Sequence, residues 1–225
     1  MTTVVARELV DGCQAVLLDL DGTLLDYAAA RDAAVVTWVQ EVAPEQLADG
    51  AGALVSRWAR LEREHFDRYT RGEATMTEQR RARVLGLLGS RPDPDALFAR
   101  FLELSEQHWR PLPGVVEAVR ALAATRPVGV LSNGILEVQS RKLDRIGLSD
   151  LPRFVSSHLP APKPDRRAFE AACAGLGARP GQTVMVGDDL ATDVEGALAA
   201  GLQAVLVAGR PGPVPTVASV ADLLD

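Results

Sequence analysis

The chain has 225 residues, of which 47% are hydrophobic and 24% are charged, and its formal net charge is −6. A chain of this length and composition folds into a globular core, either as one domain or as a domain with a smaller insertion. The negative charge argues against a nucleic-acid-binding surface, and no apolar run approaches the roughly 20 residues that a membrane helix needs. We therefore expect neither a nucleic-acid partner nor a membrane partner.

The start of the chain and the cysteines bear on its location. Arg7 and Glu8 interrupt the apolar residues near the start, so we expect no secretory signal there. Cys13 and Cys173 have no paired spacing, which favours reduced thiols over a disulfide framework. These features predict a cytoplasmic protein.

The first predicted strand is followed by a long helical region. An apolar run at 15–20 predicts a buried strand, but from about 27 to 109 no strand pattern is present. An insertion of this size is far longer than a crossover between strands needs, so we expect a helical subdomain. Its helical segments, separated by glycine and proline, are predicted at 27–42, 53–71, 75–88 and 94–109.

The second half of the chain alternates between strands and helices. Helical patterns at 135–146, 165–176 and 189–200 separate apolar runs, and this alternation at short intervals predicts right-handed crossovers in a parallel sheet. The fold class is therefore α/β, a Rossmann-like three-layer core with a parallel five-stranded sheet and an all-helical insertion. The four further strands are predicted at 127–132, 153–157, 183–187 and 203–207.

Polar residues follow four of the five predicted strands. In an open parallel sheet, ligands bind beyond the carboxyl ends of the strands, so these residues are expected to meet at one edge. In chain order they are Asp19 and Asp21, Ser132 and Asn133, Lys163, and then Asp188, Asp189 and Asp193.

Several of these residues are carboxylates. Carboxylates that converge without histidine or cysteine favour a hard divalent cation, usually Mg²⁺. Gly22 lets the chain turn sharply after Asp21, and Thr23 is suited to capping or to a hydrogen bond with a ligand. The alternatives are a solvated aspartate in an ordinary turn and, for 188–193, acids that complement the start of a helix.

Lys163 and Ser132 suggest an anion. Only two of the 24 basic residues are lysines, Lys142 and Lys163, and an ammonium group suits a phosphoryl oxygen or a carboxylate. Ser132 opens a helix, whose free N–H groups attract anions, although a plain helix cap would have the same sequence. Lys163 could likewise be a surface lysine in a proline-rich loop.

Four segments in this order resemble the motifs of the haloacid dehalogenase superfamily: DLDGT (19–23), LSNG (131–134), PKPD (162–165) and GDDLATD (187–193). The insertion resembles the C1 cap of the small-molecule phosphatases of that superfamily. The resemblance covers nearly the whole chain. It implies a catalytic core formed by 1–25 and 111–225, and a helical cap domain at 26–110.

The resemblance implies roles for the acids. Asp19 would be the nucleophile that forms an aspartyl-phosphate, and Asp21 would be the general acid and base. Mg²⁺ would be held by Asp19, Asp188 and the main-chain carbonyl of Asp21. Asp193 would orient the lysine or a metal-bound water, and Asp189 would be a further supporting residue.

It also implies a phosphate site. Ser132, the amide of Asn133 and Lys163 would bind the transferring phosphoryl group, with Lys163 also taking part in catalysis. Thr23 is expected among the phosphate-binding residues.

These inferences predict a Mg²⁺-dependent phosphatase that hydrolyses a small phosphorylated metabolite, as a monomer or a homodimer. A phosphomutase of the same superfamily would keep both acids of the first motif. A 2-haloacid dehalogenase would not have an acid at position 21, because halide leaves without a proton. A catalytically silent binding or regulatory protein on the same fold is the alternative outside enzymes. Nucleotides, sugar phosphates and phosphoglycolate all remain as candidate substrates.

Overall fold

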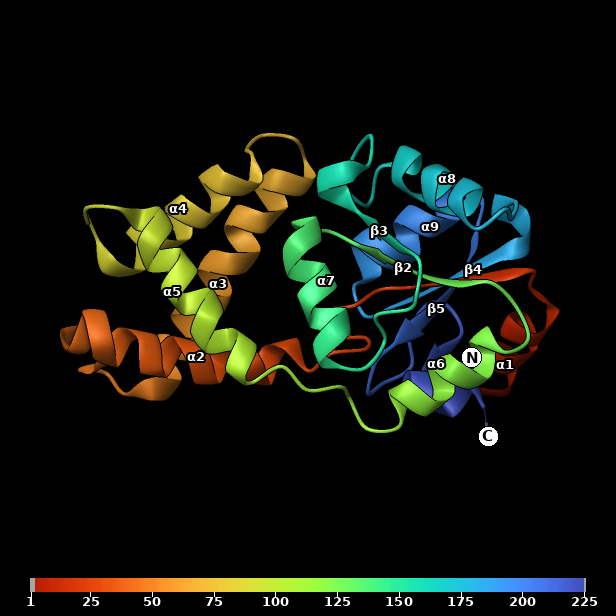
Figure 1. Ribbon diagram of the computed structural model, residues 1–225, viewed down its shortest axis with the longest axis horizontal. Helices are drawn as coiled ribbons and strands as arrows, with labels where there is room; N and C mark the ends of the chain where they lie inside the picture. Colours follow the sequence, from red (N-terminus) through yellow and green to blue (C-terminus); the bar gives the residue numbers. More distant parts are fainter. Residues whose placement is uncertain (1–2, 225) are drawn as a thin grey trace. The chain divides into compact units, whose positions relative to one another are not determined.

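The computed structural model describes residues 3–224, which divide into two units (Figure 1). The core unit comprises the chain up to Asp26 and from Arg110 onward. The helical insertion comprises Tyr27–Trp109. Within the described residues, no helix is both long enough and apolar enough to cross a membrane.

The core unit contains a six-stranded parallel sheet with the strand order β3-β2-β1-β4-β5-β6. The five predicted strands are all present. The sixth, β6, has only two residues in a proline-rich stretch, too short to show a pattern in the sequence. The strands are β1 (Ala15–Leu18), β2 (Val128–Ser132), β3 (Arg153–Val155), β4 (Thr183–Gly187), β5 (Gln203–Val207) and β6 (Thr216–Val217).

Strand β1 lies at the centre of the sheet, between β2 and β4. Leu17 pairs with Gly129 on one side and with Met185 on the other. Every residue of these three strands is buried. Continuous apolar runs in the sequence follow from this burial, because helices cover both faces of a parallel sheet.

The helices of the core unit lie on the two faces of the sheet, α8 and α9 on one and α1 and α6 on the other (Figure 1). The sequence patterns did not predict α1 or α6. The helix predicted at 189–200 is instead a π-helical segment, η4 (Leu190–Glu195), followed by α9. The helices are α1 (Thr3–Gly12), α6 (Val115–Ala123), α7 (Leu136–Arg145), α8 (Arg166–Gly175) and α9 (Gly196–Ala199), and the short final helix is a 3₁₀ turn, η5 (Val220–Leu223).

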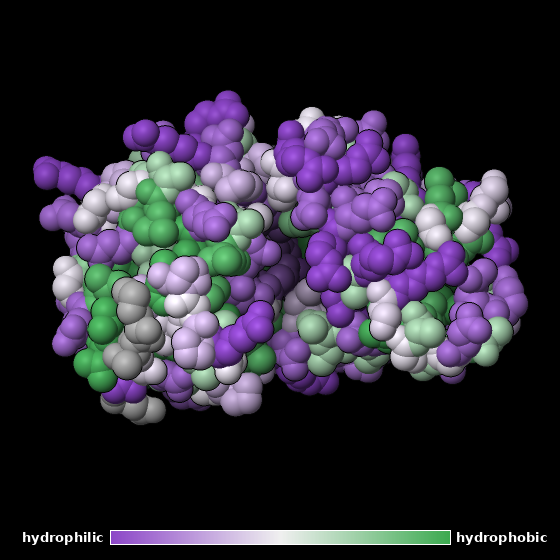
Figure 2. All heavy atoms as spheres, turned by 180° about the vertical axis from the view of Figure 1, so that it is seen from behind, coloured by the Kyte–Doolittle hydropathy of each residue, from purple (hydrophilic) through white to green (hydrophobic). Residues whose placement is uncertain are grey.

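The insertion is all-helical, as predicted, and has a hydrophobic core of its own. Trp38, Trp58 and Phe101 are buried there, with ring centroids 5.0 to 5.6 Å apart. On the face shown in Figure 2, hydrophilic side chains cover most of its surface. Its helices are α2 (Tyr27–Val42), α3 (Ala51–Thr70), α4 (Met76–Leu88) and α5 (Pro94–Gln107), with a 3₁₀ turn, η1 (Pro44–Leu47), between the first two.

Candidate active site

Two acids follow neighbouring strands of the sheet. Leu18 at the end of β1 pairs with Val186 of β4, and Asp19 donates its main-chain N–H to the carbonyl of Val186. Asp188 follows directly after β4. The register therefore brings Asp19 and Asp188 to the same edge of the sheet, as the sequence predicted.

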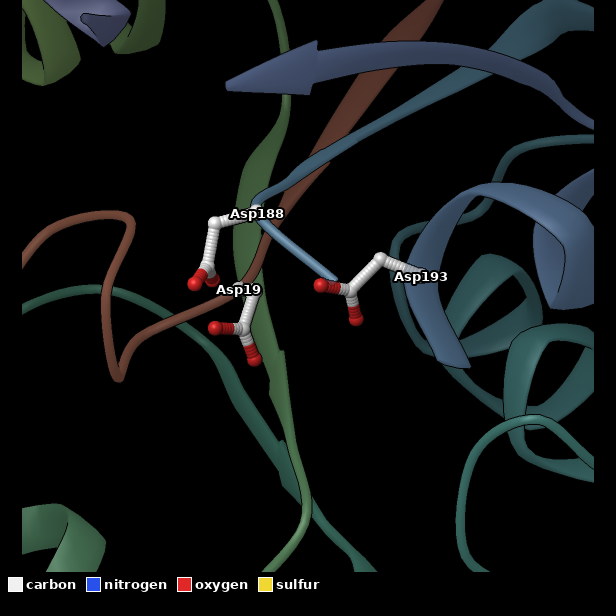
Figure 3. A group of neighbouring side chains, drawn as sticks. All are labelled: Asp19, Asp188 and Asp193. Carbon is white, nitrogen blue, oxygen red and sulfur yellow. The ribbon is translucent and has the colours of Figure 1, made fainter. Parts of the chain in front are cut away.

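A third acid joins them from η4. Asp19, Asp188 and Asp193 each offer one carboxylate oxygen, and these three oxygens lie within 4.8 Å of one another. Figure 3 shows Asp19 and Asp188 side by side after their strands, with Asp193 reaching toward them from its helical segment. Asp19 and Asp193 are only 7% and 1% exposed. The cluster is therefore compact, with Asp19 and Asp193 buried and Asp188 exposed at its open side.

Two glycines make room for this cluster. A Cβ atom at Gly22 would lie 2.3 Å from Oδ2 of Asp188, and one at Gly187 would lie 2.3 Å from Oδ2 of Asp193. Gly22 also has a φ of +97°, which residues with a side chain rarely adopt. Both glycines are therefore required by the close approach of the acids.

Lys163 supplies a positive charge to the cluster. Its Nζ lies 2.6 Å from Oδ1 of Asp19 and 2.6 Å from Oδ1 of Asp193. The lysine is 2% exposed. Burial by itself lowers the pKa of Lys163, but the charges of Asp19 and Asp193 outweigh it and raise that pKa above its usual value. Lys163 is therefore fully protonated at neutral pH.

One lysine does not compensate three carboxylates. Burial, together with the charges of Asp193 and Asp188, raises the pKa of Asp19 well above its usual value despite the contact with Lys163. Burial and the charge of Asp193 raise the pKa of Asp188 to about 6. Three ionised acids and one ammonium group have a net charge of −2. One divalent cation would balance this charge.

The donor set suits magnesium. The cluster offers carboxylate oxygens without histidine or cysteine, which is the chemistry that Mg²⁺ prefers. Thr23 is fully buried, and its hydroxyl donates a 3.0 Å hydrogen bond to Oδ1 of Asp188. Thr23, expected near the phosphate, therefore lies against an acid of the cluster and orients it.

The end of β2 contributes Ser132 and Asn133. The side-chain amide of Asn133 donates to the carbonyl of Lys163 at 2.8 Å, and its oxygen accepts from the N–H of Lys163 at 2.8 Å. This side chain thus holds the main chain of the lysine. The hydroxyl of Ser132 accepts a 2.6 Å hydrogen bond from Nε2 of Gln139.

Asp21 lies outside the acidic cluster and has partners of its own. Lys142 Nζ lies 2.7 Å from its Oδ1 and 2.6 Å from its Oδ2, and Gln139 Nε2 lies 3.0 Å from Oδ2. No pattern in the sequence predicted a role for Lys142 or Gln139. The signal that could have found Lys142 is the scarcity of lysine, which had pointed to Lys163.

Asp189 has a different position from the other acids of its motif. Its side chain accepts hydrogen bonds from the N–H groups of Ala191 and Thr192, at 3.0 and 2.8 Å, and so caps η4. The side chain is exposed. Its main-chain N–H donates to Oδ2 of Asp193 at 3.1 Å. Asp189 therefore supports Asp193 through the backbone, and its own carboxylate is not part of the acidic cluster.

Comparison with known proteins identifies the family. The model of the haloacid dehalogenase-like hydrolases matches residues 13–201, which include all the residues of the site. The chain belongs to the haloacid dehalogenase-like hydrolases. As in other members of this superfamily, the helical insertion of this hydrolase follows the first strand of the sheet.

Curated relatives of this hydrolase include phosphatases. It is 30% identical to the ribulose-1,5-bisphosphate 5-phosphatase of Halopiger xanaduensis over 204 residues, which cover 85% of this chain and 83% of that protein. It is also 30% identical over 114 residues to the pyrimidine 5'-nucleotidase YjjG of Escherichia coli. That match covers 49% of this chain and 50% of the nucleotidase, so it spans about half the length of this relative.

Solved structures share the fold. The HAD-hydrolase YfnB from Bacillus subtilis, which was solved bound to magnesium, superposes with a TM-score of 0.81 at 20% identity, covering 94% of this chain and 96% of that one. L-2-haloacid dehalogenases superpose as well. At these identities, the similarities show the shared fold alone.

Proposed function

We propose that this hydrolase is a Mg²⁺-dependent phosphatase that acts on a small phosphorylated metabolite through an aspartyl-phosphate on Asp19. The observation that carries the proposal is the pair of acids after β1. Asp19 contacts Lys163 and lies in the acidic cluster, whereas Asp21 is held apart from the cluster by Lys142. Two carboxylates in different surroundings are suited to different chemical roles.

In the first step, a carboxylate oxygen of Asp19 attacks phosphorus and the ester P–O bond breaks. Asp21 gives its proton to the departing oxygen, so that the leaving group departs as an alcohol. In the second step, Asp21 takes a proton from water as the water attacks the aspartyl-phosphate. The P–O bond to Asp19 then breaks, which releases inorganic phosphate and restores both acids.

The metal site that we propose uses the groups the sequence predicted. Asp19, Asp188 and the main-chain carbonyl of Asp21 would hold Mg²⁺. When bound, the ion would supply Lewis-acid stabilisation of phosphoryl charge and screen the nucleophile from it. Asp193 orients Lys163, which it contacts at 2.6 Å.

Three groups would bind the phosphoryl oxygens. They are the hydroxyl of Ser132, the main-chain amide of Asn133 and the ammonium group of Lys163. The side chain of Asn133 is engaged with Lys163, so its part in this site is to position the lysine. Thr23 supports Asp188 and is not included in the phosphate site.

The helical insertion would be the cap domain, whose role is to exclude water and to select the substrate. The curated relatives are named for different esters, a ribulose bisphosphate and a pyrimidine nucleotide. Specificity for one metabolite would then reside in the insertion, while the core would supply the shared chemistry.

Phosphatase activity is tested by release of p-nitrophenol and phosphate from p-nitrophenyl phosphate. We expect turnover that requires Mg²⁺, is abolished by EDTA and is lost in Asp19→Asn. Turnover that survives either treatment would rule out the mechanism. Halide release from 2-chloropropionate without phosphate release would instead identify a haloacid dehalogenase, and a panel of phosphorylated metabolites would identify the substrate.

A further inference from the structure

We infer that Lys142 and Gln139 are positioning residues for proton transfer. They hold the carboxylate of Asp21 in the orientation in which it serves the leaving group. This inference rests on the proposed function, because it assigns them to the acid of that reaction.

The geometry restrains both oxygens of Asp21. Lys142 Nζ lies 2.7 Å from Oδ1 and 2.6 Å from Oδ2, and Gln139 adds a 3.0 Å hydrogen bond to Oδ2. The Lys142 and Gln139 side chains are buried, whereas the side chain of Asp21 is 24% exposed. Two buried donors therefore hold one carboxylate, leaving part of it accessible.

Both donors come from one face of one helix. Gln139 and Lys142 are three residues apart on α7, a spacing that places two side chains together. The same Gln139 Nε2 lies 2.6 Å from the hydroxyl of Ser132. One glutamine thus links the acid after β1 to the proposed phosphate-binding serine at the end of β2.

The choice of residue favours a functional role over a structural ion pair. The chain has only two lysines, and each contacts one of the two acids after β1, Lys163 with Asp19 and Lys142 with Asp21. The exposed ion pairs on the helices use arginine, as in Arg166 with Glu170. A buried ion pair contributes little to stability relative to apolar side chains, so stability does not explain Lys142.

The orientation of Asp21 should affect the rate most when the leaving group is poor, because such a group needs a proton to depart. General acid catalysis contributes about 10² to 10⁴ in rate when the departing oxygen needs a proton. A good leaving group such as p-nitrophenolate departs without one. The effect of removing Lys142 should therefore depend on the basicity of the leaving group, which a purely structural residue would not produce.

The test compares kcat/KM of Lys142→Met and wild type for p-nitrophenyl phosphate, phenyl phosphate and an alkyl phosphate. We expect a loss of less than about tenfold for p-nitrophenyl phosphate and of about a hundredfold for the alkyl ester. Arg145→Met, an exposed change on the same helix, is the matched control and should retain all three activities. Equal losses for the three esters in Lys142→Met would overturn the inference.

A double-mutant cycle with phenyl phosphate, whose leaving group is poorer, gives an independent measure. If Lys142 acts through Asp21, adding Lys142→Met to Asp21→Asn should cause no further loss. The same fractional loss in both backgrounds would show that Lys142 acts independently, and would reject the inference. If Lys142→Met does not fold, Gln139→Leu carries the same leaving-group comparison.

Different results would reject the phosphatase mechanism and the positioning role of Lys142. Wild-type turnover that persists in EDTA or in Asp19→Asn would reject the phosphatase mechanism itself. A Mg²⁺-dependent, Asp19-dependent wild type with uniform losses in Lys142→Met would reject only the positioning role.

Discussion

The side chain of Asn133 and the main chain of Lys163 are joined by two reciprocal hydrogen bonds of 2.8 Å. They connect the end of β2 to the loop after β3, 30 residues further along the chain. The contact fixes the backbone from which Lys163 reaches Asp19. Asn133 thus positions the buried ammonium group of Lys163 through the main chain of that lysine.

Asn133→Ala should lower kcat by about tenfold to a hundredfold, because small displacements of a catalytic group reduce rates strongly. Two lost hydrogen bonds should also cost about 2 kcal/mol of unfolding free energy. Phosphatase assays and urea unfolding measure both effects. Thr125→Ala, which removes one hydrogen bond to a main-chain carbonyl at the end of α6, is the control and should keep full kcat. Unchanged kcat in Asn133→Ala would contradict the positioning of Lys163.

Lys163→Arg should lose most of kcat, at least about a hundredfold, because a planar guanidinium does not replace a buried point charge between two acids. Folding should be retained at reduced stability, measured by circular dichroism and thermal unfolding. Arg166→Lys, an exposed exchange of the same two residue types, should have no effect on kcat. Wild-type turnover in Lys163→Arg would show that the geometry of the ammonium group is not needed.

Gly22→Ala should weaken Mg²⁺ binding, because the new Cβ would displace the Asp188 carboxylate, 2.3 Å away. We expect the Kd for Mg²⁺ to rise by at least about tenfold, together with about 1 kcal/mol of strain at a positive φ. Calorimetric titration with Mg²⁺ measures the Kd. Gly12→Ala, where no atom lies within 4 Å of the added Cβ, is the control. An unchanged Kd for Mg²⁺ in Gly22→Ala would show that Asp188 does not hold the ion.

Substitution of Asp193 should reduce kcat far more than substitution of Asp189, four residues away. Asp193→Asn weakens the buried contact with Lys163 and should reduce kcat by about a hundredfold. Asp189→Asn keeps a helix-capping side chain and should change kcat less than about twofold. The kcat of both variants is measured with p-nitrophenyl phosphate. Similar losses in the two variants would place the Asp189 carboxylate in the reaction.

Mg²⁺ binding should strengthen as the pH rises through about 6, because the pKa of Asp188 is raised to about 6 and the ion needs the ionised carboxylate. Without the ion, the folded state holds a proton that the unfolded state releases near pH 4, so stability should fall between about pH 4 and 6. Added Mg²⁺ should therefore raise Tm more at about pH 7.5 than at about pH 5. Equal rises in Tm at both pH values, or the same pH dependence in Asp188→Asn, would contradict this assignment.

Local patterns in the sequence predicted most of the fold. The continuous apolar runs of β1, β2 and β4 follow from their burial, because every residue of these strands is buried. Glycine and proline marked the helices of the insertion. The segment predicted as a helix at 189–200 is helical over 190–199, but its first part is a π-helix, because the Asp189 carbonyl accepts an i→i+5 hydrogen bond from the N–H of Val194.

Side-chain roles were predicted less completely than strands. Asp19, Asp188 and Lys163 could be placed at one edge because strand ends in a parallel sheet share that edge. The hydroxyl of Thr23, which was expected among the phosphate-binding residues, donates to Asp188, a contact that the sequence did not predict. Which atom a short side chain contacts depends on the turn that carries it, and sequence spacing does not contain that information.

By itself, the sequence determined the order of the elements and which polar residues follow the strands, since both depend on neighbours along the chain. Only the tertiary structure decided that Lys142 and Gln139 meet Asp21, more than a hundred residues away. That meeting depends on which face α7 turns toward the sheet and on how closely it packs. Both are set by the packing of the whole core unit, which no single segment encodes.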